Sequence, residues 1–174
     1  MQSNHSIPIF GLGTWQLTGK TCFNAVKAAL ALGYNHIDTA EIYGNQREIG
    51  AAIKGFDRKN LFITSKVWRD NLGYDDTITS AENTLKELGI SYLDLLLIHW
   101  PNKSIPVKEP LQAFKQLVEE DKTKSVGVSN FTIRHLREAL DVSKIPISVN
   151  QVEFHPYLYQ RELLDFCKKN NILL

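Results

Sequence analysis

Short apolar runs alternate with longer amphipathic stretches along most of this chain, and that alternation restricts the folds open to it. The apolar runs are Asn35 to Asp38, Leu61 to Ser65, Leu93 to Ile98, Ser125 to Val128 and Ile147 to Asn150. Their apolar character along the whole run is typical of strands that are covered on both faces. Strand, helix and strand in regular repetition predict a parallel sheet with right-handed crossovers, either a doubly wound sheet or a (β/α)8 barrel.

The stretches between these runs carry signals for helix ends. Thr21 and one of Asp75 or Asp76 are candidate N-caps, and Gly33 and Gly89 are the expected stops. Apolar residues at helical spacing indicate later helices at Leu111 to Val118, at Ile133 to Leu140 and at Arg161 to Asn170. The loop from Pro101 to Pro110 is the longest expected connection.

Polar residues stand at the carboxyl end of nearly every predicted strand. They are Asp38, Lys66, His99, Ser129 with Asn130, and Gln151. In a barrel these ends converge on one mouth, so residues far apart in sequence share a pocket, whereas an open sheet spreads them along a line. We therefore expect an α/β fold of the (β/α)8 TIM-barrel type, in one domain over residues 1–174.

The chain has 174 residues, whereas a complete (β/α)8 barrel takes about 250. About six strand-helix units are present, and Asn171 to Leu174 resembles the start of a seventh strand. Because the sequence stops inside an apolar run, we expect a truncated barrel whose first and sixth strands have exposed edges. We expect this chain to associate or aggregate, and a full-length parent to be a monomer.

Charge and composition exclude several classes of partner. Twenty Lys and Arg against nineteen Asp and Glu leave no basic excess for nucleic-acid phosphates or a membrane surface, so a small molecule is the expected partner. Met1 to Ser6 lacks the apolar core of a signal peptide, and Leu93 to Ile98 is too short to span a bilayer, which favours a cytoplasmic protein. Cys22 and Cys167 stand apart, so we expect neither a disulfide nor a metal site.

Four residues at or near the strand ends form a chemically useful set: Asp38, Tyr43, Lys66 and His99. A tyrosine can protonate a carbonyl oxygen, although its reference pKa is about 10. A nearby ammonium lowers that pKa, a carboxylate keeps the ammonium charged, and an imidazole orients the carbonyl. Taken singly, each has a simpler interpretation: a cap for Asp38, packing for Tyr43, solvation for Lys66 and the core's edge for His99. Their joint placement favours the chemical interpretation.

A series of motifs in this chain resembles the aldo-keto reductase family. Gly11-Leu-Gly-Thr-Trp15 resembles the family's opening, and Gly33 to Asn45 its first signature, with Tyr43 five residues after Asp38. The later motifs are Ile63-Thr-Ser-Lys-Val-Trp68, Asp94 to Pro101, Gly127-Val-Ser-Asn-Phe131 and Asn150 to Pro156. The resemblance is greatest to the small bacterial-type members that act on 2,5-diketo-D-gluconate and similar carbonyls.

The resemblance implies an NADP(H)-dependent oxidoreductase that reduces aldehydes and ketones to alcohols by hydride transfer from NADPH. Tyr43 matches the general acid, Lys66 and Asp38 the residues that tune it, and His99 the residue that positions the carbonyl. The implied cofactor-binding residues are Thr14, Trp15, Asp38, Ser129, Asn130 and Gln151. The implied substrate pocket consists of Trp15, Trp68, His99 and Trp100, although core packing is the alternative interpretation of the tryptophans.

The family's seventh and eighth units have no counterpart in this chain. In the family they carry the aromatic residue that stacks on the nicotinamide, the belt over the pyrophosphate and the basic cluster for the 2′-phosphate, so NADPH rests on resemblance alone. Two alternatives therefore stay open: a catalytically inactive fragment, and a non-enzymatic NADP(H)-binding regulatory module of the same fold. The presence of Tyr43 and Lys66 argues against the binding module.

Overall fold

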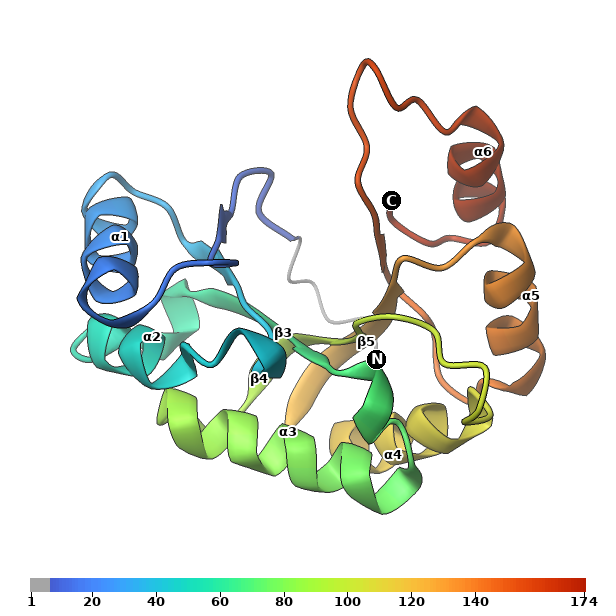
Figure 1. The fold of residues 1–174 in the computed structure, drawn as a ribbon, viewed down its shortest axis with the longest axis horizontal. Helices are drawn as coiled ribbons and strands as arrows, with labels where there is room; N and C mark the ends of the chain where they lie inside the picture. Colours follow the sequence, from blue (N-terminus) through green and yellow to red (C-terminus); the bar gives the residue numbers. More distant parts are fainter. Residues whose placement is uncertain (1–6) are drawn as a thin grey trace.

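The computed structural model describes residues 7–174 and shows a curved sheet with helices on its convex side (Figure 1). Met1 to Ser6, where the sequence suggested no signal peptide, lie outside the described residues. The parallel strands are β1 (Leu12–Gly13), β2 (His36–Asp38), β3 (Phe62–Val67), β4 (Leu93–Ile98), β5 (Thr123–Ser129) and β6 (Asn150–Gln151). They pair in chain order, as in part of a barrel wall.

One helix or more follows each strand. The α-helices are α1 (Gly19–Ala31), α2 (Gln46–Ile53), α3 (Tyr74–Leu88), α4 (Lys108–Glu119), α5 (Ile133–Val142) and α6 (Arg161–Lys169). Short 3-10 turns are η1 (Glu41–Tyr43), η2 (Arg58–Asn60) and η3 (Arg69–Asn71). Within residues 7–174, none of these helices has the length and apolar character needed to cross a membrane.

The pairing of all six strands in chain order, on one curved sheet (Figure 1), confirms the predicted barrel architecture over the doubly wound one. The five predicted strands are present within a few residues, and Gly33 and Gly89 follow α1 and α3 with positive φ as expected. The capping predictions were wrong. The N-caps are Thr18 and Gly73, because both helices begin before the predicted cap and leave Thr21 and both aspartates within or near the first turn.

Three further elements differ from the expectation. Strand β1 was missed because two residues carry no alternation, and α2 was missed between two motifs. The loop after β4 is shorter than expected, because α4 begins at Lys108 and takes Pro110 into its first turn, where proline is tolerated.

Alternate residues along each strand separate two apolar layers. Ile63, Leu96 and Val128 belong to the large core between sheet and helices. Phe62 and Leu97 belong to a smaller cluster on the concave side. Because side chains alternate between the two faces of a strand, Lys66 and His99 lie on the same concave side as Phe62 and Leu97. The pleat therefore turns the polar strand ends toward the inside of the curve.

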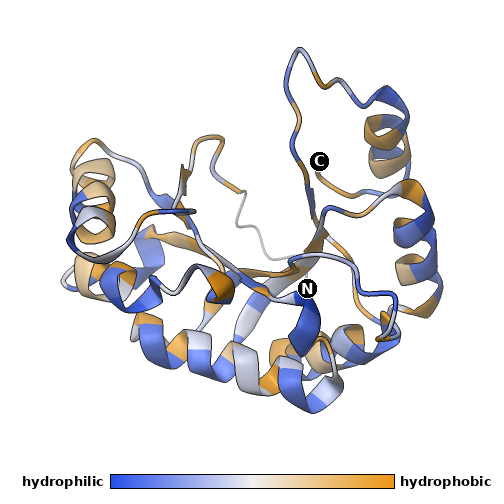
Figure 2. Ribbon diagram, viewed as in Figure 1, coloured by the Kyte–Doolittle hydropathy of each residue, from blue (hydrophilic) through white to orange (hydrophobic). Residues whose placement is uncertain are grey.

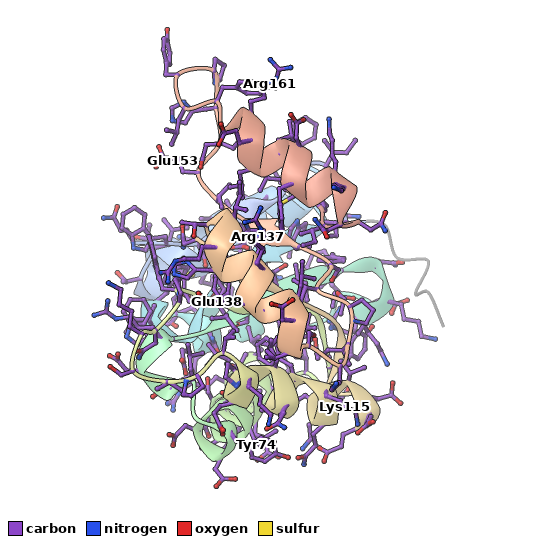
Figure 3. All side chains as sticks on the ribbon, turned by 90° about the vertical axis from the view of Figure 1, so that its right-hand side faces the viewer. Tyr74, Lys115, Arg137, Glu138, Glu153 and Arg161 are labelled. Carbon is purple, nitrogen blue, oxygen red and sulfur yellow. The ribbon has the colours of Figure 1, made fainter. Side chains whose placement is uncertain are left out.

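The helices pack on the convex side with amphipathic faces. Figure 2 shows hydrophilic residues along the outer side of α5, whose buried residues are Leu136 and Ala139. Seen from that side, charged residues such as Lys115 and Glu138 lie on the outside of the helices (Figure 3). Cys22 in α1 and Cys167 in α6 are buried in this core as free thiols.

The last residues of the chain extend the sheet beyond β6. Leu173 forms a parallel bridge with Val149, and its amide donates to the Ser148 carbonyl at 2.9 Å. The Asn150 amide donates in turn to the Leu173 carbonyl at 2.8 Å. This pairing confirms the expectation that Asn171 to Leu174 begins a further strand.

Candidate functional site

A pocket of about 970 Å³ lies at the carboxyl-terminal ends of the strands, on the concave side of the sheet. Every predicted site residue lines it except Thr14 and Lys66. The structure thus brings together side chains from β2, η1, β4, β5 and β6, which are separated by more than a hundred positions in the chain. His36, which the sequence analysis did not assign, lies deeper in the same pocket and hydrogen-bonds to Thr64 at 2.9 Å.

Asp38, which lines the pocket, forms an ion pair with Lys66, which is buried behind it. Lys66 lies in β3 with 2% of its surface exposed, and its ammonium donates to Asp38 Oδ1 and, at 3.0 Å, to the Thr39 carbonyl. Burial lowers the pKa of Lys66, and the charge of Asp38 opposes that change. Gln151 Nε2 donates to the second carboxylate oxygen of Asp38 at 2.7 Å, so β6 is joined to β2 across the mouth.

Thr14 is not among the residues that line the pocket, and its predicted role at a cofactor site stays a prediction. Its side chain is fully buried, and its hydroxyl donates to the Asp38 carbonyl at 3.0 Å. Asn45 holds the same region: its amide donates to the carbonyls of Thr14 at 2.8 Å and Leu17 at 2.9 Å, and its oxygen accepts from Thr39 at 2.9 Å. Both side chains support the loop next to Asp38, and the role of Asn45 was missed because its partners are distant in sequence.

Tyr43 is the last residue of η1, directly before Gly44, which adopts a positive φ of 63°. Its ring lies 5.4 Å from Lys66 Nζ and 5.6 Å from the His99 ring. Burial and the charge of Asp38 raise the pKa of Tyr43 to about 12. The pKa of Tyr43 is therefore raised and not lowered as expected, because burial has the largest effect and the charge of Asp38 adds to it.

The Tyr43 hydroxyl forms no hydrogen bond with any side chain or backbone group of the described residues. This hydroxyl is therefore available to a ligand in the pocket. The raised pKa keeps it protonated at neutral pH, so the group it offers is a proton donor.

His99 follows β4 and is 7% exposed. Its ring contacts Tyr43 edge-on, and Trp68 at 5.3 Å between ring centroids. Burial and the charge of Lys66 lower the pKa of His99 to about 4, so the ring is neutral at pH 7. Its Nδ1 atom is buried without a hydrogen-bond partner among residues 7–174. A neutral imidazole can donate one hydrogen bond into the pocket without bringing a charge.

Ser129, Asn130 and Gln151 form the opposite side of the pocket. Asn130 has a positive φ of 62°, and its amide donates to the His99 carbonyl at 3.0 Å and to Ser129 Oγ at 3.1 Å. The Ser129 hydroxyl donates to the Gln151 carbonyl at 2.8 Å. The side-chain oxygens of Asn130 and Gln151 accept no hydrogen bond from the described residues. These two acceptors fit the amino group of a carboxamide, as nicotinamide carries.

The three tryptophans stand around the pocket with different exposure. Trp15 is 68% exposed and Trp100 45% exposed, while Trp68 is half-buried against His99. They are not core packing, since all three line the pocket. The described residues contain no cluster of three or more His, Cys, Asp or Glu suited to a metal ion.

Known proteins resemble this chain in sequence and in fold. Residues 10–174 match the model of the aldo/keto reductase family. A glyoxal reductase of Bacillus subtilis is 46% identical over 97% of this chain and 62% of its own length. An aldo-keto reductase from a Medee basin deep-sea metagenome library has a TM-score of 0.94 at 47% identity, over 98% of this chain and 64% of that structure.

A solved Bombyx mori aldo-keto reductase in complex with NADP has a TM-score of 0.90 at 30% identity, over 98% of this chain and 62% of that structure. The present chain spans 61% and 62% of the lengths of the first two curated relatives it matches.

Proposed function

This chain belongs to the aldo/keto reductase family, and from that premise we propose that its pocket reduces small aldehydes and ketones to alcohols with NADPH as the hydride donor. One observation carries the proposal: the Tyr43 hydroxyl has no partner among the described residues, and it lines one pocket with His99 and with Asp38, whose carboxylate is paired with the buried Lys66. Together these residues supply a proton donor, an orienting group and a buried cation.

Tyr43 delivers the proton. When bound, the dihydronicotinamide of NADPH supplies the hydride to the carbonyl carbon. The phenol of Tyr43 gives its proton to the carbonyl oxygen, so the C=O double bond becomes a C–O single bond, new C–H and O–H bonds form, and Tyr43 is left as a phenolate. The Lys66 ammonium, 5.4 Å from the Tyr43 ring, stabilises that negative charge. Asp38 keeps Lys66 charged and directed.

His99 and the tryptophans position the substrate. The neutral His99 ring can hydrogen-bond to the carbonyl oxygen beside Tyr43, which aligns the carbonyl for proton transfer. Trp15, Trp68 and Trp100 offer flat apolar surfaces to the rest of the molecule. Asn130 and Gln151 would hold the carboxamide of the cofactor through their free side-chain oxygens, with Ser129, Asp38 and Trp15 beside them.

The proposal is tested by measuring turnover of glyoxal or glyceraldehyde with NADPH. The loss of NADPH absorbance monitors the reaction. The first substrate is chosen because a relative 46% identical is a glyoxal reductase, and the second because a relative 36% identical is a D/L-glyceraldehyde reductase. Tyr43→Phe should lower turnover about 10²- to 10⁴-fold, because it removes the general acid. NADPH binding, measured by quenching of tryptophan fluorescence, should be unchanged.

Tyr157→Phe is the matched control, because Tyr157 is 97% exposed. Full turnover in Tyr43→Phe would remove Tyr43 from its role. NADPH binding without turnover of any carbonyl would indicate a binding module, and the loss of both would indicate an inactive chain.

A further inference from the structure

The carboxylate of Glu41 joins several elements of the fold through hydrogen bonds. Glu41 opens η1, two residues before Tyr43. Its carboxylate accepts hydrogen bonds from the Trp68 backbone amide, from Asn71 Nδ2 at 3.2 Å and from Ser80 Oγ at 2.5 Å. One side chain thus joins η1 to the end of β3, to η3 and to α3.

These contacts reach three side chains of the pocket. Tyr43 shares the 3-10 turn with Glu41, and Gly44 closes that turn by donating its amide to the Glu41 carbonyl at 3.2 Å. Trp68 is held through its own backbone amide, and its ring lies against His99. A movement of Glu41 would therefore shift Tyr43 and Trp68 relative to each other and change the surroundings of His99.

The chemistry of a carboxylate suits this place. An ionised carboxylate is an acceptor only, with two oxygens that can take several donors, and all three of its partners here are donors. An alanine would leave the Trp68 amide, Asn71 and Ser80 without this acceptor. Glutamine would keep one oxygen for the Trp68 amide and place its amino group near Ser80 Oγ, which can also accept.

We infer that Glu41 is a positioning residue, which fixes the Tyr43 phenol and the Trp68 ring in the pocket by tying both to α3. Glu41 itself does not line the pocket: it acts through the two residues it holds. Its effect on turnover rests on the proposed function, whereas its effect on the position of Tyr43 does not.

Aromatic NMR of the chain with ring-labelled tyrosine tests the inference without requiring turnover. The Tyr43 signal is assigned with Tyr43→Phe. We expect Glu41→Ala to shift or broaden that signal, and Ser80→Ala to do so less, because it removes one of the three donors. Glu41→Gln should retain most of the wild-type position. Tyr92, which packs on Arg58 far from η1 in the fold, serves as the internal reference.

Glu87→Ala is the matched control, because Glu87 lies on the same helix as Ser80 but its carboxylate forms only a surface pair with Arg47. An unmoved Tyr43 signal in folded Glu41→Ala would overturn the inference. If Glu41→Ala does not fold, Ser80→Ala decides in the same way: a shifted Tyr43 signal supports the inference and an unshifted one overturns it.

Turnover separates this inference from the proposed function. In an active chain, Glu41→Ala should lower kcat about 10- to 100-fold, because a misplaced acid loses alignment, while KM changes little. A wild-type chain that never turns over, but whose Tyr43 signal moves in Glu41→Ala, would overturn the proposed function and support the positioning role. If wild type and Glu41→Ala are both active and turn over equally, the proposed function is supported and the positioning role is overturned.

Discussion

The two sides of the pocket are built differently. On the side of β2 and β3, Lys66 is 2% exposed, and Thr14, Thr39 and Asn45 are fully buried and joined by hydrogen bonds. On the side of β6, the chain continues into a loop whose aromatic residues lie in solvent, with Tyr157 97% exposed. Figure 3 shows this loop, marked by Glu153 and Arg161, extending beyond α5.

The difference separates two requirements of the proposed reaction. Groups that move a proton must be held in place before the substrate arrives, and the first side meets this requirement with bonds inside the protein. Groups that bind a ligand must have hydrogen-bonding capacity to spare, and the second side keeps the free oxygens of Asn130 and Gln151. Substitutions on the side of β2 and β3 should therefore lower the stability of the fold. Substitutions on the side of β6 should mainly weaken ligand binding.

The largest loss of stability is expected for Lys66→Met, on the side of β2 and β3. It leaves the Asp38 carboxylate without its cation, and we expect a loss of about 3–5 kcal/mol in the free energy of unfolding, measured with urea. Lys115→Met removes a cation of an exposed pair with Glu119 and should cost about 1 kcal/mol or less. Equal losses in the two variants would show that the first side is no more tightly built than the surface.

Asn45→Ala should cost about 2–4 kcal/mol, because it leaves the carbonyls of Thr14 and Leu17 and the hydroxyl of Thr39 without their partner. Asn83→Ala on the exposed face of α3 gives the background value for an asparagine. Thermal unfolding of both variants measures the difference. A cost for Asn45→Ala no greater than that for Asn83→Ala would contradict the role of Asn45.

Acid should lower the free energy of unfolding through His99, which follows β4 and contacts Tyr43. The pKa of His99 is about 4 in the folded chain against an ordinary value of 6.5, so between these values the unfolded chain binds the extra proton. Stability therefore falls as the pH is lowered from about 6.5 to 4, by about 2–3 kcal/mol from this group. In His99→Asn, urea unfolding should lose this part of the pH dependence, and an unchanged slope would contradict the neutral ring.

The smallest effect is expected on the second side. Gln151→Leu removes the link from β6 to Asp38, and we expect a cost of about 1 kcal/mol in stability, since the pair is half-exposed. NADPH binding should weaken more clearly, because the free amide oxygen is lost as well. A variant that binds NADPH as well as the wild type would show that Gln151 serves only as a link between strands.

Sequence alone could predict those residues whose place follows from the strand pattern. Asp38, Lys66, His99, Ser129 and Gln151 all follow from one rule, because parallel strands deliver their carboxyl ends to one mouth. Tyr43 came from a motif, since no periodicity places a residue in a 3-10 turn. Knowledge of the strand ends was thus enough to predict these five residues, whereas Tyr43 required the motif.

Supporting residues could not be predicted in this way. The partners of Glu41 lie 27, 30 and 39 positions away, so only the folded chain brings them together. The burial of Thr14 and the raised pKa of Tyr43 also depend on what surrounds them in space. A motif can identify a residue, but it does not predict how exposed to solvent that residue is in the folded chain.

The alternation of side chains between the two faces of the strands determines which positions of this chain can be substituted. Each strand places one side chain at the mouth and rests on an apolar layer below it, where Gly127 leaves room for Leu97 and Val149. A Cβ at Gly127 would lie 2.5 Å from the Val149 carbonyl, so this lower layer tolerates little alteration. The side chains at the mouth above this layer come from different strands. Substitutions at the strand ends can therefore change the chemistry of the pocket, while the apolar layer beneath keeps the strand ends in their positions.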